Sequence, residues 1–135
     1  MTAQTTTAPG RYTFVHIAIA LQTFALLFQA VTAGLLLTSP YGEVLHSIGA
    51  RVMYGASMLY VLAAGLAWRP GGGSPRPLLH ASGFLTLASV QVVLGIAHKP
   101  ALHVPLGVLM FGLSMLALGH AFSSTPGINP PRRTP

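Results

Sequence analysis

The chain has 135 residues and only 6% of them are charged, whereas about a quarter of the residues in a typical soluble domain carry a charge. Hydrophobic residues make up 52% of the chain, and the formal net charge is +6. These figures exclude an ordinary soluble fold, and the absence of cysteine excludes disulfides, thiolate metal sites and iron–sulfur clusters. The basic residues lie in loops and tails without interleaved aromatic residues, so they favour an anionic lipid surface and not nucleic acid.

Long uncharged segments predict four membrane-spanning helices. No charge occurs between Arg11 and Glu43, and the same holds from Arg76 to Lys99. A helix needs about 20 residues to cross a bilayer, and lipid forces each crossing to be helical because its backbone groups must be bonded internally. We therefore expect an all-α membrane protein, a four-helix bundle with helices at residues 12–38, 44–68, 78–98 and 101–122.

The expected helices form one transmembrane domain over residues 12–122. The flanking segments, residues 1–11 and 123–135, are polar and rich in proline, which predicts disordered tails. Segments rich in proline and glycine separate the helices, at residues 39–42 and 70–75, and they predict turns and loops.

The distribution of basic residues predicts the orientation of the chain. If both ends lie on the inner side of the membrane, that side carries five basic residues: Arg11, Arg69, Arg76, Arg132 and Arg133. The outer side then carries only Arg51 and Lys99. The positive-inside rule therefore predicts an N-in, C-in protein. We expect a multi-pass protein of the cell membrane, in particular of a bacterial plasma membrane.

The second and fourth helices share a sequence pattern. His-x6-Met-aromatic-Gly-x-Ser-Met-Leu begins at His46 and again at His103. The first and third helices agree more loosely, and each carries a glutamine in its outer half, Gln29 and Gln91. We therefore expect two repeated helical hairpins, related by a pseudo-two-fold axis along the bilayer normal. Equivalent helices then lie diagonally opposite each other.

His46 and His103 are the strongest candidates for a functional site. Ionisable side chains in membrane helices usually face the interior of the bundle, and the repeat places these two opposite each other at equal depth. Two opposed neutral imidazoles can hold a b-type haem, with one ring nitrogen on each axial face of the iron. The alternative is that both side chains only form hydrogen bonds among lipid headgroups at the helix ends.

Other residues are expected to complete this site. Gly49 and Gly107 lie one turn below the histidines, where a missing side chain leaves room for a flat macrocycle or permits close helix packing. Met53 and Met110 lie seven residues after each histidine, where they can wall the floor of the pocket or simply fill gaps in the core. Arg51 lies near the outer surface, where haem propionates would emerge.

Short motifs resemble the haem A synthase family. They are EVLH at residues 43–46, LH at residues 102–103 and QVVLG at residues 91–95. The resemblance covers nearly all of the chain but corresponds to only one of the two four-helix units of that family. It implies haem binding between histidines at the outer ends of the second and fourth helices, with a glutamate one turn before the first histidine.

The same resemblance does not imply the activity of the family. The chain has half the family's length, lacks the paired cysteines of many members, and has Ser47 where an arginine follows the histidine. Glu43 matches the glutamate of the family and shares a helix face with His46, three residues on. Its carboxylate can therefore accept the second N–H of that imidazole, or can act only as a negative charge at a helix N-terminus.

The remaining histidines form weaker candidates. His16 and His80 lie near the inner ends of the first and third helices, the other diagonal of the bundle, and they define a possible second haem site. His98 and His120 have no partner in the repeat, and we expect them to be interfacial.

Three function classes remain open from the sequence. The first is a small b-type cytochrome that carries electrons or haem for a membrane partner protein, and the second is a cofactor-free accessory subunit that docks on a larger complex. The third, a small multidrug transporter, ranks last because coupling generally needs a carboxylate deep in the membrane and Glu43 lies at a helix end. With a single acidic residue, paired carboxylates are impossible, and an enzyme activity of the chain alone is not expected. The sequence leaves the oligomeric state open.

Overall fold

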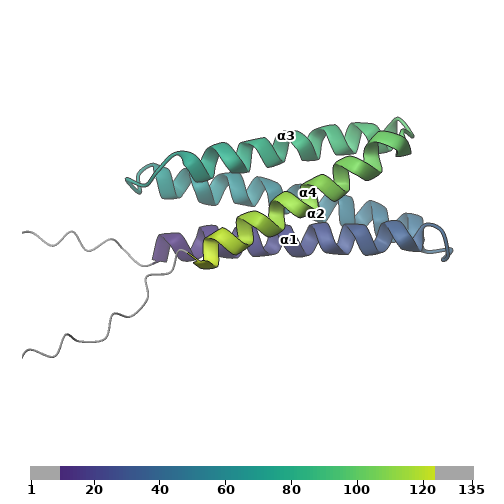
Figure 1. The fold of residues 1–135 in the computed structure, drawn as a ribbon, viewed down its shortest axis with the longest axis horizontal. Coiled ribbons are helices and arrows are strands. Elements are labelled where there is room, and N and C mark those ends of the chain that lie inside the picture. Colours follow the sequence, from purple (N-terminus) through teal and green to yellow (C-terminus); the bar gives the residue numbers. More distant parts are fainter. Residues whose placement is uncertain (1–9, 124–135) are drawn as a thin grey trace, which may run out of the picture.

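The structure, a computed structural model, describes residues 10–123 (Figure 1). These residues form four helices and no strands: α1 Gly10–Leu35, α2 Gly42–Trp68, α3 Arg76–Ile96 and α4 Pro100–Ser123. Each helix is long and apolar enough to cross a membrane. The all-helical class and the four expected spans are therefore confirmed. The predicted tails lie outside the described residues, except that α1 already begins at Gly10 and α4 includes Ser123.

The end of α1 comes earlier than predicted, at Leu35 instead of residue 38. The amides of Leu37 and Thr38 bond to carbonyl oxygens three residues back, at 3.1 and 3.2 Å, which is the spacing of a 3₁₀ turn. Pro40 follows closely, and a helix usually ends before the residue that precedes a proline.

The turn between α3 and α4 is set by a left-handed residue. His98 has a φ of +51°, and the amide of Lys99 bonds back to the carbonyl of Leu94 at 3.0 Å. This combination is a common way to terminate a helix, so α3 stops at Ile96, two residues before the predicted end. Pro100 then opens α4, at a position where a helix needs no N–H.

The four helices pack in a ring. The main contacts of α1 are with α2 and α4, and α3 packs against the same two helices, so α2 and α4 lie on one diagonal. Figure 1 shows α4 crossing the bundle obliquely, from the side of α3 at one end to the side of α1 at the other. We call the end where residues 36–41 and 97–99 join the helices the hairpin end. The start of α1 and the end of α4 lie together at the opposite end (Figure 1).

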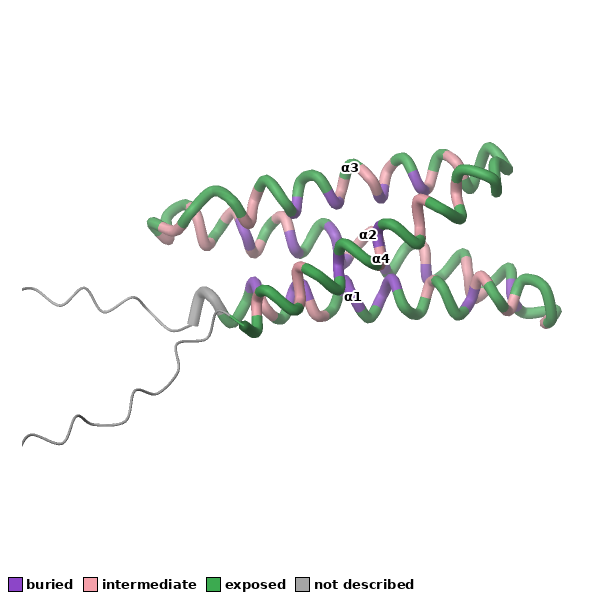
Figure 2. Tube along the Cα trace, viewed as in Figure 1, coloured by how far each residue is buried: buried purple, intermediate pink, exposed green. Residues whose placement is uncertain are grey.

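The core of the ring consists of two apolar clusters, and most large apolar side chains outside it are exposed, as expected for a lipid-facing surface (Figure 2). The cluster nearer the hairpin end contains Ala25, Leu26, Met53, Ala56, Phe84, Ala88 and Met110. The cluster nearer the opposite end contains Val15, Ala18, Ile19, Tyr60, Ala64 and Ala81. Alanine is common in both clusters because small side chains let membrane helices approach closely.

A polar contact ties α1 to α4 between these clusters. The hydroxyl of Thr23 donates to the carbonyl of Ile19 at 2.8 Å and shares a hydrogen bond with the hydroxyl of Ser114, 2.7 Å away. Both Thr23 and Ser114 are buried. In a medium without water, such a bond stabilises the pairing of the two helices.

Candidate functional site

His46 and His103 lie opposite each other at the hairpin end, near the starts of α2 and α4. The centroids of their imidazole rings are 6.2 Å apart, and the ring planes meet at 67°. Both side chains are half-buried. The structure therefore brings together the two residues that the sequence pattern pairs.

Each histidine is held by a glutamine of the preceding helix. The side-chain amide of Gln29 donates to the backbone carbonyl of His46 at 3.2 Å, and that of Gln91 donates to the carbonyl of His103 at 2.8 Å. A carbonyl oxygen can only accept, so the donor must be the amide nitrogen in both cases. The same hydrogen bond, from a glutamine amide to a histidine carbonyl, therefore joins α1 to α2 and α3 to α4. We call it the glutamine lock.

The glycines below the histidines make room for these amides. A Cβ at Gly49 would collide with Oε1 of Gln29, and a Cβ at Gly107 would lie 2.9 Å from Nε2 of Gln91. Each glycine therefore leaves room for the glutamine side chain that lies against it. The Oε1 atoms of both glutamines are buried without a hydrogen-bond partner in the described part of the chain, so the amides are held mainly through their donors.

The contacts of His103 determine which of its nitrogens carries the proton. Nδ1 lies 3.0 Å from the backbone carbonyl of Gln91, which only accepts, so Nδ1 carries the hydrogen. Nε2 of the neutral ring then bears the lone pair. The ring also packs against Gly95, where a Cβ would come within 3.3 Å of Cε1.

The contacts of His46 lead to the same tautomer. Nε2 lies 3.3 Å from the amide nitrogen of Gln29, which only donates, so Nε2 accepts. Nδ1 lies 3.2 Å from the hydroxyl of Thr32, whose own proton goes to the carbonyl of Gln29 at 3.1 Å. Both imidazoles are therefore held through an Nδ1–H, which leaves Nε2 of each ring with its lone pair.

Two predicted site residues lie apart from the histidine pair. Glu43 is exposed. The ring nitrogens of His46 bond to Gln29 and Thr32, so Thr32 takes the role of hydrogen-bond partner that we expected of Glu43. Arg51 is also exposed, because five residues on a helix place it some 140° round from His46.

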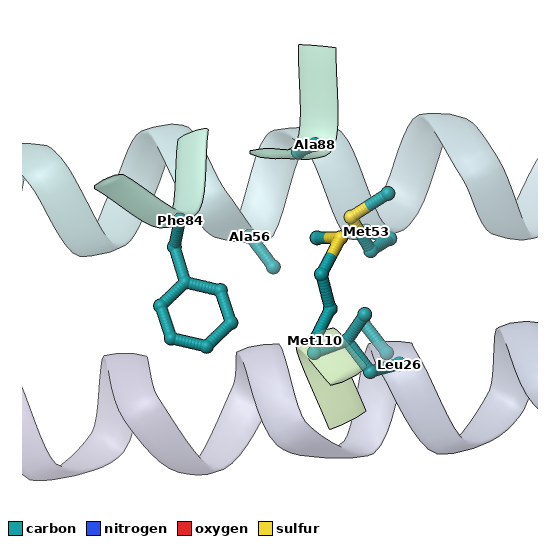
Figure 3. Packing of buried hydrophobic residues seen from close by; sticks show 7 residues of the cluster. Leu26, Met53, Ala56, Phe84, Ala88 and Met110 are labelled. Carbon is teal, nitrogen blue, oxygen red and sulfur yellow. The ribbon is translucent and has the colours of Figure 1, made fainter. Parts of the chain in front are cut away.

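The two methionines close the space below the histidines. Met53 is 2% exposed and Met110 is fully buried, and Figure 3 shows their side chains reaching toward each other among Leu26, Phe84 and Ala88. They belong to the apolar cluster nearer the hairpin end. Their position fits the expected floor of a pocket.

The pair at the opposite end, His16 and His80, is not brought together in the same way. His16 stacks on Phe122 with ring centroids 6.1 Å apart, and His80 is exposed. The two histidines are out of register, because His16 precedes Gln29 by 13 residues whereas His80 precedes Gln91 by 11. A slip of two residues turns a side chain by about 200° round a helix, so equivalent faces do not carry both rings.

The other two histidines lie on the surface. His98 and His120 are both exposed, and Nδ1 of His120 bonds to the carbonyl of Leu116 at 2.7 Å. No group of three or more His, Cys, Asp or Glu side chains gathers around a common point in residues 10–123. Among the described residues, His46 and His103 are the two histidines whose rings the structure records in contact with each other.

An apolar groove of about 520 Å³ lies elsewhere, between α1 and α2. It is lined by Phe14, Ile17, Ala18, Leu21, Leu59, Leu62, Ala63, Leu66, Ala67 and Pro70. Because its lining offers no polar side chain, this groove can accept a hydrocarbon chain but has no side chain to ligate a metal.

The residues that sequence reasoning missed are the ones that orient the histidines. Thr32 did not stand out, and Gln29 and Gln91 were noticed only as marks of the repeat. A signal was present, since each is a polar side chain in an apolar helix at the depth of a histidine. Comparison of the chain with models of protein families, with curated proteins and with solved structures gives no match.

Proposed function

We propose that this protein binds one haem b between His46 and His103 and uses it to transfer electrons or to handle haem in the membrane. The observation that carries the proposal is the pair of opposed imidazoles on α2 and α4, 6.2 Å apart. Two imidazoles that ligate one iron from opposite sides, through metal–nitrogen bonds of about 2 Å, have ring centroids roughly 6 Å apart. The spacing of the pair thus fits axial ligation.

The tautomers of the two rings also support the proposal. Metal-ligating histidines usually donate their other N–H to a carbonyl or a carboxylate, which fixes the ring and raises its basicity. The acceptor is the carbonyl of Gln91 for His103 and the hydroxyl of Thr32 for His46. To ligate a metal, His46 has to give up the 3.3 Å contact of its Nε2 with Gln29.

The surroundings suit a redox group of low polarity. Met53 and Met110 exclude water from below, and the lipid-facing side chains around the hairpin end are apolar. When bound, a haem with two histidine ligands supplies one-electron chemistry, which the protein tunes through its ligands and their hydrogen bonds. The chain itself then holds and orients the rings and keeps water away.

The matched environments of α2 and α4 support reading the chain as two repeated hairpins. Met53 and Met110, and likewise Ser57 and Ser114, are separated by 57 residues, as are the two histidines, and the members of each pair are equally buried. On this reading the protein resembles a single four-helix unit of the haem A synthase family. The proposal extends to haem binding and not to the activity of that family.

The location and partners belong to the same proposal. We expect an N-in, C-in protein in the plasma membrane of a bacterium, with a membrane redox or haem-handling protein as its partner. The lipid bilayer contacts the exposed apolar faces of all four helices.

Absorption spectroscopy of the protein purified in mild detergent tests haem binding. We expect a low-spin b-type spectrum, and we expect His46→Ala and His103→Ala each to abolish it or to convert it to high spin. His98→Asn is the matched control, because asparagine tolerates the left-handed conformation of that residue, and it should leave the spectrum unchanged.

A wild-type protein that stays colourless after haem supplementation would contradict the proposal. The second function class, a cofactor-free accessory subunit, would then take its place. In that case the glutamine–histidine contacts would serve only to hold the helices together.

Reporter fusions test the orientation. The positive-inside rule predicts a cytoplasmic signal from fusions after Gly73 and after the C-terminal residue, and an extracytoplasmic signal from a fusion near Gly42. The reverse pattern would put the histidine pair on the cytoplasmic side of the membrane.

A further inference from the structure

The two histidines differ in one contact. Nε2 of His46 lies 3.3 Å from the amide nitrogen of Gln29. For Nε2 of His103, the structure records no hydrogen-bond partner among the described residues. Both glutamines donate to a histidine carbonyl, so the two glutamines differ in whether they also contact Nε2, the nitrogen that would bind a metal.

We infer that His103 is the permanent axial ligand of the haem and that His46 is a displaceable one, so that the site also binds small neutral iron ligands such as carbon monoxide. This inference rests on the proposed function. The lone pair on Nε2 of His46 can accept the Gln29 hydrogen or bind iron, but not both. His46 therefore exchanges between an amide and a metal, and the position that it leaves is open to another ligand.

The remaining contacts of His46 let it move without being lost. Nδ1 donates to Thr32, a hydroxyl that can rotate, and Gln29 receives Nε2 when the ring leaves the metal. The structure holds the ring in this amide-bonded arrangement.

His103 has no comparable freedom. Its Nδ1–H bonds to the backbone carbonyl of Gln91 at 3.0 Å, and a backbone carbonyl within α3 cannot rotate. Its ring also lies against Gly95, close enough that a Cβ there would come within 3.3 Å. The ring is thus fixed both by a hydrogen bond and by packing.

The first test compares the two histidine variants loaded with haem. We expect His46→Ala to keep its haem in a five-coordinate, high-spin form that binds carbon monoxide more tightly than the wild type. We expect His103→Ala to lose most of its haem during purification. Haem content per protein and the spectrum of the reduced, carbon monoxide-treated protein measure both effects.

The second test removes the competing amide. Gln29→Leu and Gln29→Met should both lower the affinity of the reduced protein for carbon monoxide by about tenfold, because the loss of one hydrogen bond favours His46 on the iron by that factor. Gln91→Leu is the matched control, since it breaks the equivalent bond to a histidine carbonyl without touching Nε2. It should leave the carbon monoxide affinity within about twofold of the wild type, well below the effect of one hydrogen bond.

The outcomes separate this inference from the proposed function. A protein that never binds haem overturns both. A haem-loaded wild type that binds no carbon monoxide overturns only the inference, as does equal haem loss in the two histidine variants. An equal effect of the Gln29 and Gln91 variants on carbon monoxide affinity also overturns it.

Discussion

The two ends of the bundle each carry a pair of histidines, but only one pair is organised. At the hairpin end, His46 and His103 face each other, and each is bonded to polar groups of a neighbouring helix. At the opposite end, His16 lies against Phe122 and His80 is exposed. Equal numbers of histidines thus do not make equal sites. What distinguishes the hairpin end is a set of side chains on other helices that fixes each ring.

Replacing both histidines of a pair tests this comparison most severely. We expect His46→Ala with His103→Ala to remove all bound haem, because the described residues offer no other opposed imidazoles. His16→Ala with His80→Ala should keep a single haem per protein. A haem assay on the purified proteins measures both, and loss of half the haem from the second variant would show a second site at the opposite end.

The glutamine lock can be tested through the glycine that admits it. Gly107→Ala places a Cβ 2.9 Å from Nε2 of Gln91, so the amide must move and the bond to His103 is lost. We expect the lost hydrogen bond to cost about 1 kcal/mol and so to offset the gain in helix propensity that alanine brings, together with faster haem loss. Thermal unfolding in detergent, followed by haem absorbance, provides the measurement.

Gly112→Ala is the matched control on the same helix. A Cβ at Gly112 meets nothing within 4 Å, and alanine is the better helix former by about 0.5–1 kcal/mol. This variant should be as stable as the wild type or more so. If the two variants behave alike, the glutamine lock does not stabilise the hairpin end.

The smallest expected effect distinguishes Thr32 from Glu43. Thr32→Val removes the acceptor of the His46 Nδ1–H, which lowers the basicity of the imidazole, so the midpoint potential of the haem should rise. Glu43→Gln should leave the potential unchanged and lower stability by about 0.3–1 kcal/mol, as for a charge lost at a helix N-terminus. Redox titration compares the two, and a shift only in Glu43→Gln would restore Glu43 as the partner of His46.

Much of the fold could be predicted because membrane helices follow simple physical rules. The gaps between charges locate three of the four spans, the second is apolar around Arg51, and lipid requires each span to be helical. The shared pattern of the second and fourth helices predicts that His46 and His103 face each other, which they do. The helix ends differ by a few residues where local turn geometry decides, as at His98 with its positive φ.

The partners of the histidines could not be predicted, since they depend on how neighbouring helices are rotated. Sequence reasoning favours a partner on the same helix, and so it pointed to Glu43. Thr32 comes from α1 and reaches His46 only because α1 turns that face toward α2. The exposure of His80 could not be predicted for the same reason. The spacing from His80 to Gln91 differs from the spacing of His16 to Gln29, and these glutamines are known to be equivalent only once their bonds to the two histidine carbonyls are seen.

The bond between Thr23 and Ser114 joins α1 to α4, and α4 is synthesised after the other three described helices. Each histidine meets its glutamine within one hairpin, so these contacts can form as soon as that hairpin has entered the bilayer. The two rings meet only after α4 has been synthesised and has docked on α1. Assembly of the site is therefore a late event in biogenesis, and a chain that stops before α4 presents His46 with its anchors but with nothing opposite it.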